Sequence, residues 1–236
     1  IIIEVGGSPM IMNKKLDISV IVRSKNEERW IGHCLQSLLD NIENPEIIVV
    51  DNNSTDDTLP IVNTFQHDPM LKDHRRYAAT KVISIDKYTP GRAINMGAQA
   101  AVNKYTLVIS SHCVLKNFDL TLLKEHLEDN SAVFGNQTPF YNGKRIGKRY
   151  IWEHFGEEKV KNLYSNMEGR YFFHNAASFF KTDVLLQHPF DENLTGKEDR
   201  YWAGNMVEQG HSFLYEPDFR VDHHYTENGN TWKGIG

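Results

Sequence analysis

The first half of the 236-residue chain alternates runs of β-branched residues with helix-like patterns. Continuous apolar runs are typical of parallel strands that are buried on both faces. Such runs predict four strands, at 18–22, 46–50, 81–85 and 105–110. Apolar residues at helical spacing, or helix-forming stretches between strands, predict helices at 30–39, 55–65 and 92–103. This alternation predicts an α/β fold with a mostly parallel, doubly wound sheet and right-handed crossovers.

The second half is less regular. It adds a strand candidate and a helix candidate, at 176–180 and 198–209. We find no repeat, low-complexity tract or linker, so we expect one domain over residues 13–236. Within it, 13–115 form a nucleotide-type half and 116–236 a different second half. Residues 1–12 lack the pattern of a signal peptide and are set aside as a tag remnant or a disordered start.

Composition narrows the function classes. Apolar residues make up 40% and charged residues 24%, which fits a soluble globular protein. The net charge of −5 argues against a general nucleic-acid binder. No apolar run is long enough to span a membrane. Two cysteines, Cys34 and Cys113, are too few for a disulfide framework and indicate a reducing, cytoplasmic compartment.

Chemistry on such a sheet is expected in the loops after the strands, where ligands bind. After the first strand, Arg23 and Lys25 precede a helix whose N-terminal amides favour an anion. The same segment has an ordinary alternative, in which Ser24 or Asn26 only caps the helix.

Two further loops carry polar side chains. Asp51 ends the second strand, where a carboxylate can accept hydrogen bonds from a base or ribose; the Asx-rich turn around it also fits simple capping. After the third strand, Arg92 has the reach and charge to bind a diphosphate, and nearby glycines permit close backbone approach.

The order of these motifs resembles a family 2 glycosyltransferase of the GT-A fold. The motifs are R-S-K-N-E at 23–27, V-D-N-N-S-T-D at 50–56, G-R-A-I-N-M-G at 91–97, G-K-E-D at 196–199 and R-V-D-H at 220–223. The resemblance implies a nucleotide-sugar-binding first half and a mixed, acceptor-binding second half. By motif position it assigns donor binding to Arg23, Lys25, Glu27, Asp51, Asn53, Arg92, Asn95, Ser110 and Ser111.

One departure from the family matters for the metal. Ser110-Ser111-His112 stands where the family has a metal-binding Asp-x-Asp motif. Either His112 and His223 (or His224) hold a divalent metal, or the site works without one, or His112 is a satisfied, half-buried residue. With histidine ligands, Mn²⁺ is favoured over Mg²⁺, which prefers oxygen. Without metal, the cations would come from Arg23, Lys25, Arg92 or the stretch Lys144, Arg145, Lys148 and Arg149.

Family 2 enzymes are typically inverting, and the resemblance implies that Asp199 is the general base. Glu198 would then contact the acceptor, and Trp202, one turn further on, is our candidate for stacking on an acceptor sugar. The ordinary alternative for the acidic pair is stabilisation of a helix N-terminus. The basic stretch near residue 145 is either a solvated loop or a mobile lid.

The leading hypothesis is a glycosyltransferase of polysaccharide biosynthesis. Its partners would be a nucleotide-sugar donor and a saccharide or lipid-linked saccharide acceptor. We expect no nucleic acid and no transmembrane segment, with peripheral contact at the inner face of the membrane as an option. The alternative is a degenerate GT-A domain that binds a nucleotide sugar or glycan without turnover. A nucleotidyltransferase is disfavoured, because the loop after the first strand has no glycine.

Overall fold

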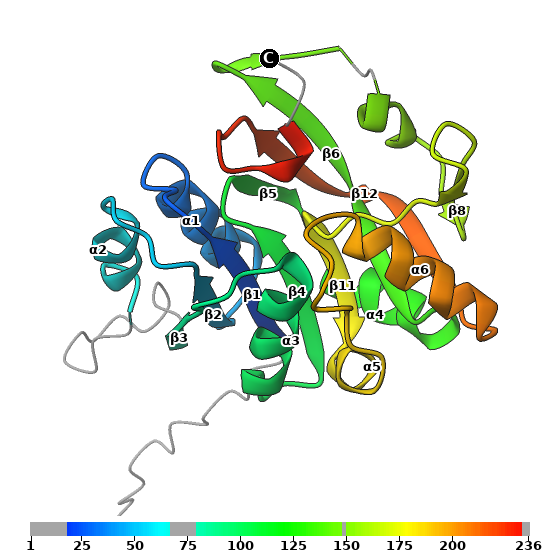
Figure 1. The fold of residues 1–236 in the computed structure, drawn as a ribbon, viewed down its shortest axis with the longest axis horizontal. Coiled ribbons are helices and arrows are strands. Elements are labelled where there is room, and N and C mark those ends of the chain that lie inside the picture. The colour runs from blue at the N-terminus through cyan, green and yellow to red at the C-terminus, as the bar shows by residue number, and fades with distance from the viewer. Residues whose placement is uncertain (1–17, 67–78, 148–149, 233–236) are drawn as a thin grey trace, which may run out of the picture.

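A computed structural model describes residues 18–66, 79–147 and 150–232, and a twisted ten-stranded sheet forms its centre (Figure 1). The strands are β1 (Ile18–Ser24), β2 (Glu46–Asp51), β3 (Ala79–Ser84), β4 (Tyr105–Ser110), β5 (Cys113–Asn117), β6 (Ala132–Tyr141), β7 (Lys144–Arg145), β8 (Val160–Lys161), β11 (Ala177–Lys181) and β12 (Phe213–His224), with a separate hairpin of β9 (Tyr164–Ser165) and β10 (Arg170–Tyr171). The helices are α1 (Ile31–Asn41), α2 (Thr58–Asn63), α3 (Pro90–Ala100), α4 (Leu120–Asp129), α5 (Thr182–Gln187) and α6 (Glu198–Glu208), with 3₁₀ turns η2 (Tyr150–His154) and η3 (Asn230–Trp232).

The strand order is β3-β2-β1-β4-β11-β6-β12-β5. The first four strands are parallel neighbours, as the apolar runs predict. β11 then runs antiparallel to both β4 and β6, β12 is parallel to β6, and β5 is antiparallel to β12. The α/β class and the parallel sheet of the first half are therefore confirmed, and the second half makes the sheet mixed. Because β5 pairs with β12, one sheet joins the two halves of the chain.

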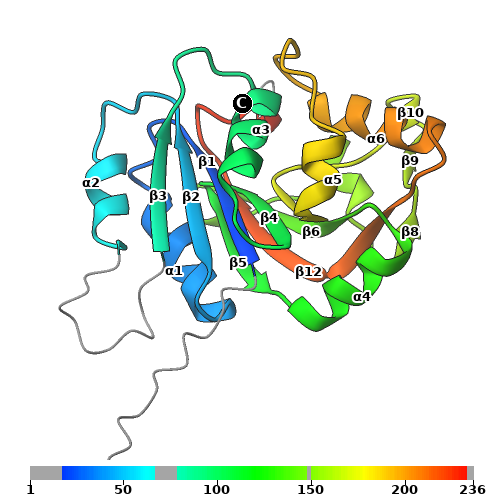
Figure 2. The same ribbon diagram turned by 90° about the horizontal axis from the view of Figure 1, so that it is seen from below.

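Each face of the sheet has its own apolar core. In β1, Val20 and Val22 face α1 and α4, while Ile21 between them faces the cluster that includes α3, α5 and α6. Figure 2 shows these two helical layers on opposite sides of the sheet. All three side chains are completely buried. This explains why the strand has a continuous apolar sequence rather than an alternating one.

The glycines around α3 serve packing within the protein. A Cβ on Gly97 would lie 2.6 Å from Ile21, and a Cβ on Gly91 would lie 2.7 Å from the carbonyl oxygen of Asp191. Either contact is too close for a real side chain. The close approach expected of these glycines is thus directed at protein neighbours, and it seats α3 on the sheet.

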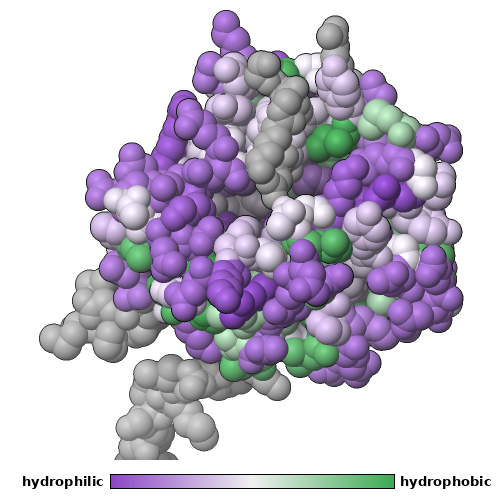
Figure 3. All heavy atoms as spheres, in the orientation of Figure 1, coloured by the Kyte–Doolittle hydropathy of each residue, from purple (hydrophilic) through white to green (hydrophobic). Residues whose placement is uncertain are grey.

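Within the described ranges, no helix has the length and hydrophobicity to cross a membrane. The face of the molecule shown in Figure 3 is largely hydrophilic, with apolar residues scattered over it.

Candidate active site

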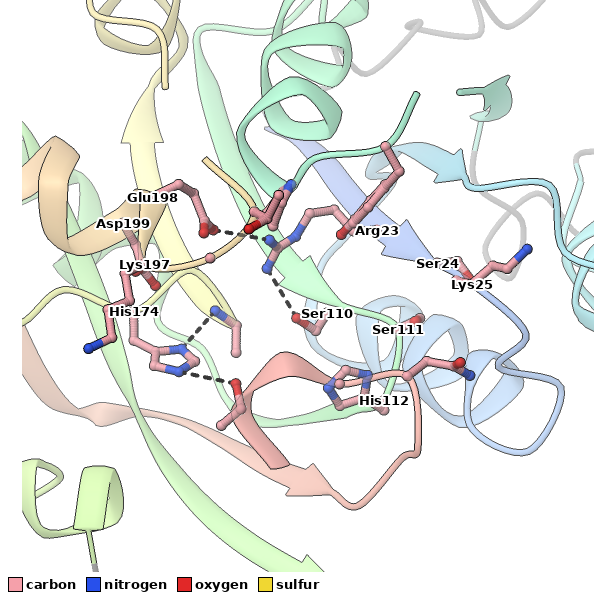
Figure 4. Close-up of a pocket in the computed structure, with 18 of the residues that line it drawn as sticks. Arg23, Ser24, Lys25, Ser110, Ser111, His112, His174, Lys197, Glu198 and Asp199 are labelled. Carbon is pink, nitrogen blue, oxygen red and sulfur yellow. Dashed lines mark hydrogen bonds and ion pairs between the residues drawn. The ribbon is translucent and has the colours of Figure 1, made fainter. Parts of the chain in front are cut away.

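A cavity of about 810 Å³ opens at the carboxyl ends of the parallel strands. Figure 4 shows side chains from both halves of the chain around it. The residues that line it are Arg23, Ser24, Lys25, Glu27, Asn52, Tyr88, Pro90, Ser110, Ser111, His112, Ile151, Glu168, His174, Ala176, Thr195, Gly196, Lys197, Glu198, Asp199, Arg200, Asn228, Gly229 and Thr231. Its size suits a nucleotide or sugar ligand, and its position is the one that the topology of such sheets predicts.

Arg23 connects the two halves of the site. Its Nη2 atom donates hydrogen bonds to Ser110 Oγ at 3.2 Å and to the carbonyl oxygen of Asn175 at 3.0 Å. Its Nη1 atom lies 3.5 Å from Glu198 Oε1 (Figure 4). The guanidinium is thereby held between the end of β4 and the start of α6, with its charge inside the cavity.

Lys25 and Glu27 belong to the loop after β1. The ammonium of Lys25 donates to the carbonyl oxygens of Asn52 and Asn53, each at 2.7 Å. The buried Glu27 lies beneath this loop, and its backbone N–H donates to Thr58 Oγ1. The loops after β1 and β2 are thus fixed to each other at the cavity wall.

Four of the expected donor-binding residues do not line this cavity. Asp51 is fully buried and accepts hydrogen bonds from both the backbone and the hydroxyl of Ser54, so it closes its own turn. Asn95 bonds to the backbone of Phe190 through both ends of its amide. The other two are Asn53 and Arg92. Local capping, the ordinary alternative for Asp51, describes what its carboxylate does in this structure.

The acidic pair begins α6, and both of its members line the cavity. Lys197 precedes them in the left-handed region with φ 59°. Asp199 Oδ2 accepts from Arg200 Nη1 at 2.9 Å and from the Asn175 N–H at 3.2 Å, and its Oδ1 accepts from the Arg200 N–H at 2.9 Å. Figure 4 shows Glu198 turned towards Arg23 and Asp199 turned towards His174.

The pKa values of these two neighbouring carboxyl groups are shifted in opposite directions. Burial and the charge of Asp199 raise the pKa of Glu198 to about 7, against the opposing effect of Arg23. Burial also acts to raise the pKa of Asp199, but Arg200 and the further hydrogen bonds outweigh it and leave that pKa below its usual value. Asp199 is therefore ionised throughout the physiological range, whereas Glu198 exchanges its proton near neutrality.

Next to Ser111 in the sequence, His112 belongs to a row of hydrogen-bonding side chains that ends at Gln137. His112 Nδ1 is 3.2 Å from Glu27 Oε1, and His223 Nδ1 is 2.8 Å from Gln137 Oε1. Because carboxylate and amide oxygens accept, both Nδ1 atoms donate, which leaves a lone pair on each Nε2. The two Nε2 atoms face each other at 3.1 Å.

A proton shared between the two Nε2 atoms, or a metal ion held by both, satisfies such a pair. Their separation suits two ligands of one metal ion whose bonds are about 2.0–2.1 Å long. Ring nitrogens oriented by a second partner are the usual arrangement at metal sites. The thiol of Cys113 belongs to the same group, in which the candidate ligand atoms lie within 4.8 Å of one another. Burial raises the pKa of that thiol well above its usual value, so the histidines are the stronger candidates.

His224 lies on the other side of β12, as strand geometry requires. Its ring stacks on Trp30 at a centroid distance of 3.9 Å. The structure thus brings His112 to His223 and not to His224.

A sequence model of glycosyl transferase family 2 matches residues 19–186, most of the chain. The chain belongs to this family. The family expectation is therefore confirmed, and with it the GT-A fold.

The curated proteins that this chain resembles are distant relatives. The chain is 24% identical to the Methanococcus voltae dolichyl N-acetyl-alpha-D-glucosaminyl phosphate 3-beta-D-2,3-diacetamido-2,3-dideoxy-beta-D-glucuronosyltransferase, over 89% of this chain and 67% of that protein. It is 26% identical to the Campylobacter jejuni GalNAc(5)-diNAcBac-PP-undecaprenol beta-1,3-glucosyltransferase, over 86% of this chain and 63% of that protein. The chain thus spans about two thirds of these relatives.

Solved structures share the fold. The S. aureus TarS fragment 1-349 in complex with UDP-GlcNAc matches with a TM-score of 0.68 at 20% identity, over 93% of this chain and 61% of that chain. The mannosyltransferase PcManGT from Pyrobaculum calidifontis, in complex with GDP-Man and Mn²⁺, matches with a TM-score of 0.65 at 18% identity, over 92% and 59%.

Several lining residues of this family 2 domain were not predicted, Arg200 among them. Two of them, His174 and Glu168, lie away from all of the motifs. His174 precedes β11, and burial together with Arg200 lowers its pKa to about 3, so its ring is neutral. Its Nδ1 accepts from the Ala176 N–H at 3.2 Å, which leaves a proton on Nε2, 3.5 Å from Thr231 Oγ1. Glu168 is the other. Neither carries a sequence signal, because each follows an irregular segment rather than a predicted strand.

One expectation is wrong for this family 2 domain. Trp202 faces the core: it is 4% exposed, donates to the His188 carbonyl oxygen at 2.7 Å and packs against Phe190. Its apolar ring stabilises α6, so the prediction that Trp202 stacks on an acceptor sugar is wrong. In the basic stretch, Lys144 and Arg145 are exposed in β7, and Lys148 and Arg149 lie outside the described residues.

Proposed function

We propose that this chain transfers a sugar from a nucleotide-sugar donor to a saccharide or lipid-linked saccharide acceptor, with inversion. The observation that carries the proposal is the joint placement of Arg23, Glu198 and Asp199 in one cavity at the carboxyl ends of the parallel strands. A transfer enzyme needs a cation for the departing diphosphate and a base for the attacking hydroxyl. The names of the relatives in Methanococcus voltae and Campylobacter jejuni favour a lipid-linked acceptor.

In this proposal Asp199 is the general base. Three hydrogen bonds orient its carboxylate, and only one of them occupies Oδ1, so that oxygen keeps a lone pair for an acceptor hydroxyl. Arg200 keeps the group ionised and therefore ready to accept a proton. Glu198, which faces Arg23, then contacts the acceptor or the transferred sugar.

The donor half of the site is proposed to use the loops after β1, β2 and β4. Arg23 presents positive charge, Lys25 holds two loops together, and Ser110 and Ser111 supply hydroxyls and backbone groups at the wall. Glu27 would contribute to donor binding indirectly, by accepting a hydrogen bond from His112 Nδ1. Asp51, Asn53, Arg92 and Asn95 are proposed to support these loops from behind.

The paired histidines fit a divalent metal. His112 and His223 would hold it, and Mn²⁺ is favoured over Mg²⁺ because both ligands are imidazoles. When bound, the ion would supply positive charge next to the donor diphosphate. A metal-independent site remains the competing proposal, in which Arg23 supplies that charge alone.

A binding domain without turnover is the second candidate, favoured by the serines that replace the usual carboxylates. Against it stands the buried acidic pair. Burying Glu198 and Asp199 at a helix start is costly, and a domain that only binds sugars has no use for a desolvated base.

The proposed cellular location depends on the proposed acceptor. We propose that the chain acts in polysaccharide biosynthesis in the cytoplasm, at the inner face of the membrane where lipid-linked saccharides are extended. Domain limits at residues 13, 115 and 236 stay a proposal.

Thermal unfolding with UDP, GDP, dTDP, CDP and CMP, each with EDTA, Mg²⁺ or Mn²⁺, tests the proposal. A ligand that binds only the folded state raises the midpoint by mass action. The corresponding nucleotide sugars are then assayed for release of nucleotide. Specific stabilisation together with nucleotide release supports transfer; stabilisation without release by parent protein supports the binding domain; no response to any nucleotide contradicts both.

A further inference from the structure

Glu168 lies in the turn between β9 and β10 and lines the cavity. Figure 2 shows these two strands beside α6. The residue after Glu168, Gly169, has φ +63°, which closes the turn. The N–H of Glu168 donates to Ser165 Oγ at 2.9 Å, and that hydroxyl also bonds to His154 Nε2 at 2.7 Å. The backbone of Glu168 is thus firmly positioned, although the turn itself is short.

The two carboxylate oxygens of Glu168 have different surroundings. Oε1 accepts a hydrogen bond from Arg200 Nη2 at 3.4 Å. Oε2 is buried and has no hydrogen-bond partner among the residues that the structure describes. The ammonium of Lys197 is 3.8 Å away, beyond hydrogen-bond distance, on a side chain that is 57% exposed. The Glu168 side chain itself is only 9% exposed.

A buried carboxylate oxygen without a partner is costly, and such atoms in folded proteins usually await a ligand or water. Neutralising Arg200 does not require this oxygen, because Asp199 Oδ2 already accepts from Arg200 Nη1 at 2.9 Å and Glu168 Oε1 faces Nη2. Arg200 also lies over the ring of Phe172, at 4.2 Å from its centroid. Glu168, Arg200 and Asp199 therefore form a hydrogen-bonded row along the cavity wall, in which Oε2 has the exposed Lys197 ammonium near it but makes no hydrogen bond within the described part of the chain.

We propose that Glu168 Oε2 accepts a hydrogen bond from a sugar hydroxyl bound in this cavity, and so contributes to the choice of sugar. The proposal rests on the proposed transferase function. Oε2 can only accept, and a pyranose presents several hydroxyl donors. Because one guanidinium separates Glu168 from the proposed base, the sugar in question either is transferred or carries the attacking hydroxyl.

Glu168→Gln is the decisive variant. The glutamine oxygen can still accept from Arg200, while its NH₂ group replaces Oε2 and donates where the carboxylate accepts. Glu168→Ala removes both contacts, and Glu208→Gln, on an exposed part of α6, is the matched control. Isothermal titration compares UDP with UDP-GlcNAc, and GDP with GDP-Man. Steady-state assays then compare KM for the donor and for p-nitrophenyl glycosides of GlcNAc, GalNAc and glucose.

If the hydroxyl belongs to the donor, Glu168→Gln weakens the nucleotide sugar tenfold or more and leaves the free nucleotide unchanged. If it belongs to the acceptor, the variant raises the acceptor KM tenfold or more with the donor KM unchanged. No change in either arm overturns the assignment, as does equal weakening of the free nucleotide, which would indicate a structural role. A parent protein that binds no nucleotide sugar overturns the proposed function itself, and the assignment with it.

Discussion

The substitution Asp199→Asn tests the proposed base with little change in shape. Asparagine keeps an oxygen for Arg200 but removes the proton acceptor, so kcat should fall by about 10²–10⁴-fold. This loss corresponds to about 3–5 kcal/mol in the activation barrier. Donor affinity should change little, because the hydrogen bonds of Asp199 go to Asn175 and Arg200 rather than to the loops after β1 and β2.

The pH dependence of kcat separates Asp199 from its neighbour. Arg200 holds the pKa of Asp199 below its usual value in spite of burial, so protonation of the base should cause no tenfold-per-unit fall in kcat between pH 8 and about pH 5. Burial and Asp199 raise the pKa of Glu198 to about 7. If Glu198 were the base, kcat would fall tenfold for each pH unit below about 7. The assay is nucleotide release from the nucleotide sugar that stabilises the protein most.

Stability must be measured on the same protein. Asp199→Asn removes one of the two carboxylates that pair with the Arg200 guanidinium in the described ranges and leaves Glu168, and breaking a buried pair costs about 3–5 kcal/mol. Circular dichroism should show a lower Tm but a folded state at assay temperature. A folded Asp199→Asn protein with parental kcat would refute the assignment, and a Glu198→Gln variant that instead loses the activity would move the role to Glu198.

Three further outcomes are expected. His112→Ala should abolish the extra thermal stabilisation that Mn²⁺ gives with nucleotide, whereas the exposed control His33→Ala should keep it; an equal Mn²⁺ effect in both would contradict the metal site. Because the folded-state pKa of Glu198 is raised from 4.5 to about 7, ionisation costs stability as the pH rises between these values, by at most about 1.4 kcal/mol per unit. Glu198→Gln should therefore exceed the parent in Tm by a margin that grows up to pH 7, and a constant margin in a pH series would contradict the shift. Trp202→Ala should cost about 3–5 kcal/mol in urea unfolding, while Trp202→Phe should keep the acceptor KM.

The sequence predicts β1, β2 and β4 well because they are buried on both faces. The edge strand β3 is mostly exposed, and its predicted start at residue 81 is two residues late. β1 and β2 are continuous apolar runs, and each falls within a residue or two of the predicted bounds. The same rule fails for β12, which carries the buried acid Glu216 and pairs with three different strands. β5 is five residues long and has a lysine, so it shows neither a run nor an alternation. Such strands are defined by their partners.

The candidate site divides along the same line. Arg23 and Ser110 are predictable, since the carboxyl ends of parallel strands meet at one edge. Asp51 also stands at the carboxyl end of a parallel strand, yet its carboxylate accepts hydrogen bonds from the nearby Ser54. No pattern in the sequence shows which carboxylates will bond to their own turn and which will face a ligand. Glu168 and His174 reach the cavity only through the packing of β10 against α6 and of β11 against β4. Contacts between segments so far apart in the sequence depend on the whole fold, and local sequence patterns do not predict them.

The charge of the cavity wall bears on the choice between a metal-dependent and a metal-free site. Among the described lining residues, the acids Glu27, Glu168, Glu198 and Asp199 equal in number the bases Arg23, Lys25, Lys197 and Arg200. Three of the bases already face lining acids, Arg23 with Glu198 and both Lys197 and Arg200 with Glu168, and Lys25 is bound to backbone carbonyls. A diphosphate in this cavity would therefore meet little uncompensated positive charge, and as Glu198 ionises above neutrality it would meet less. The facing Nε2 lone pairs of His112 and His223 are the place where the wall can accept a further cation, which is why we favour the metal-dependent site.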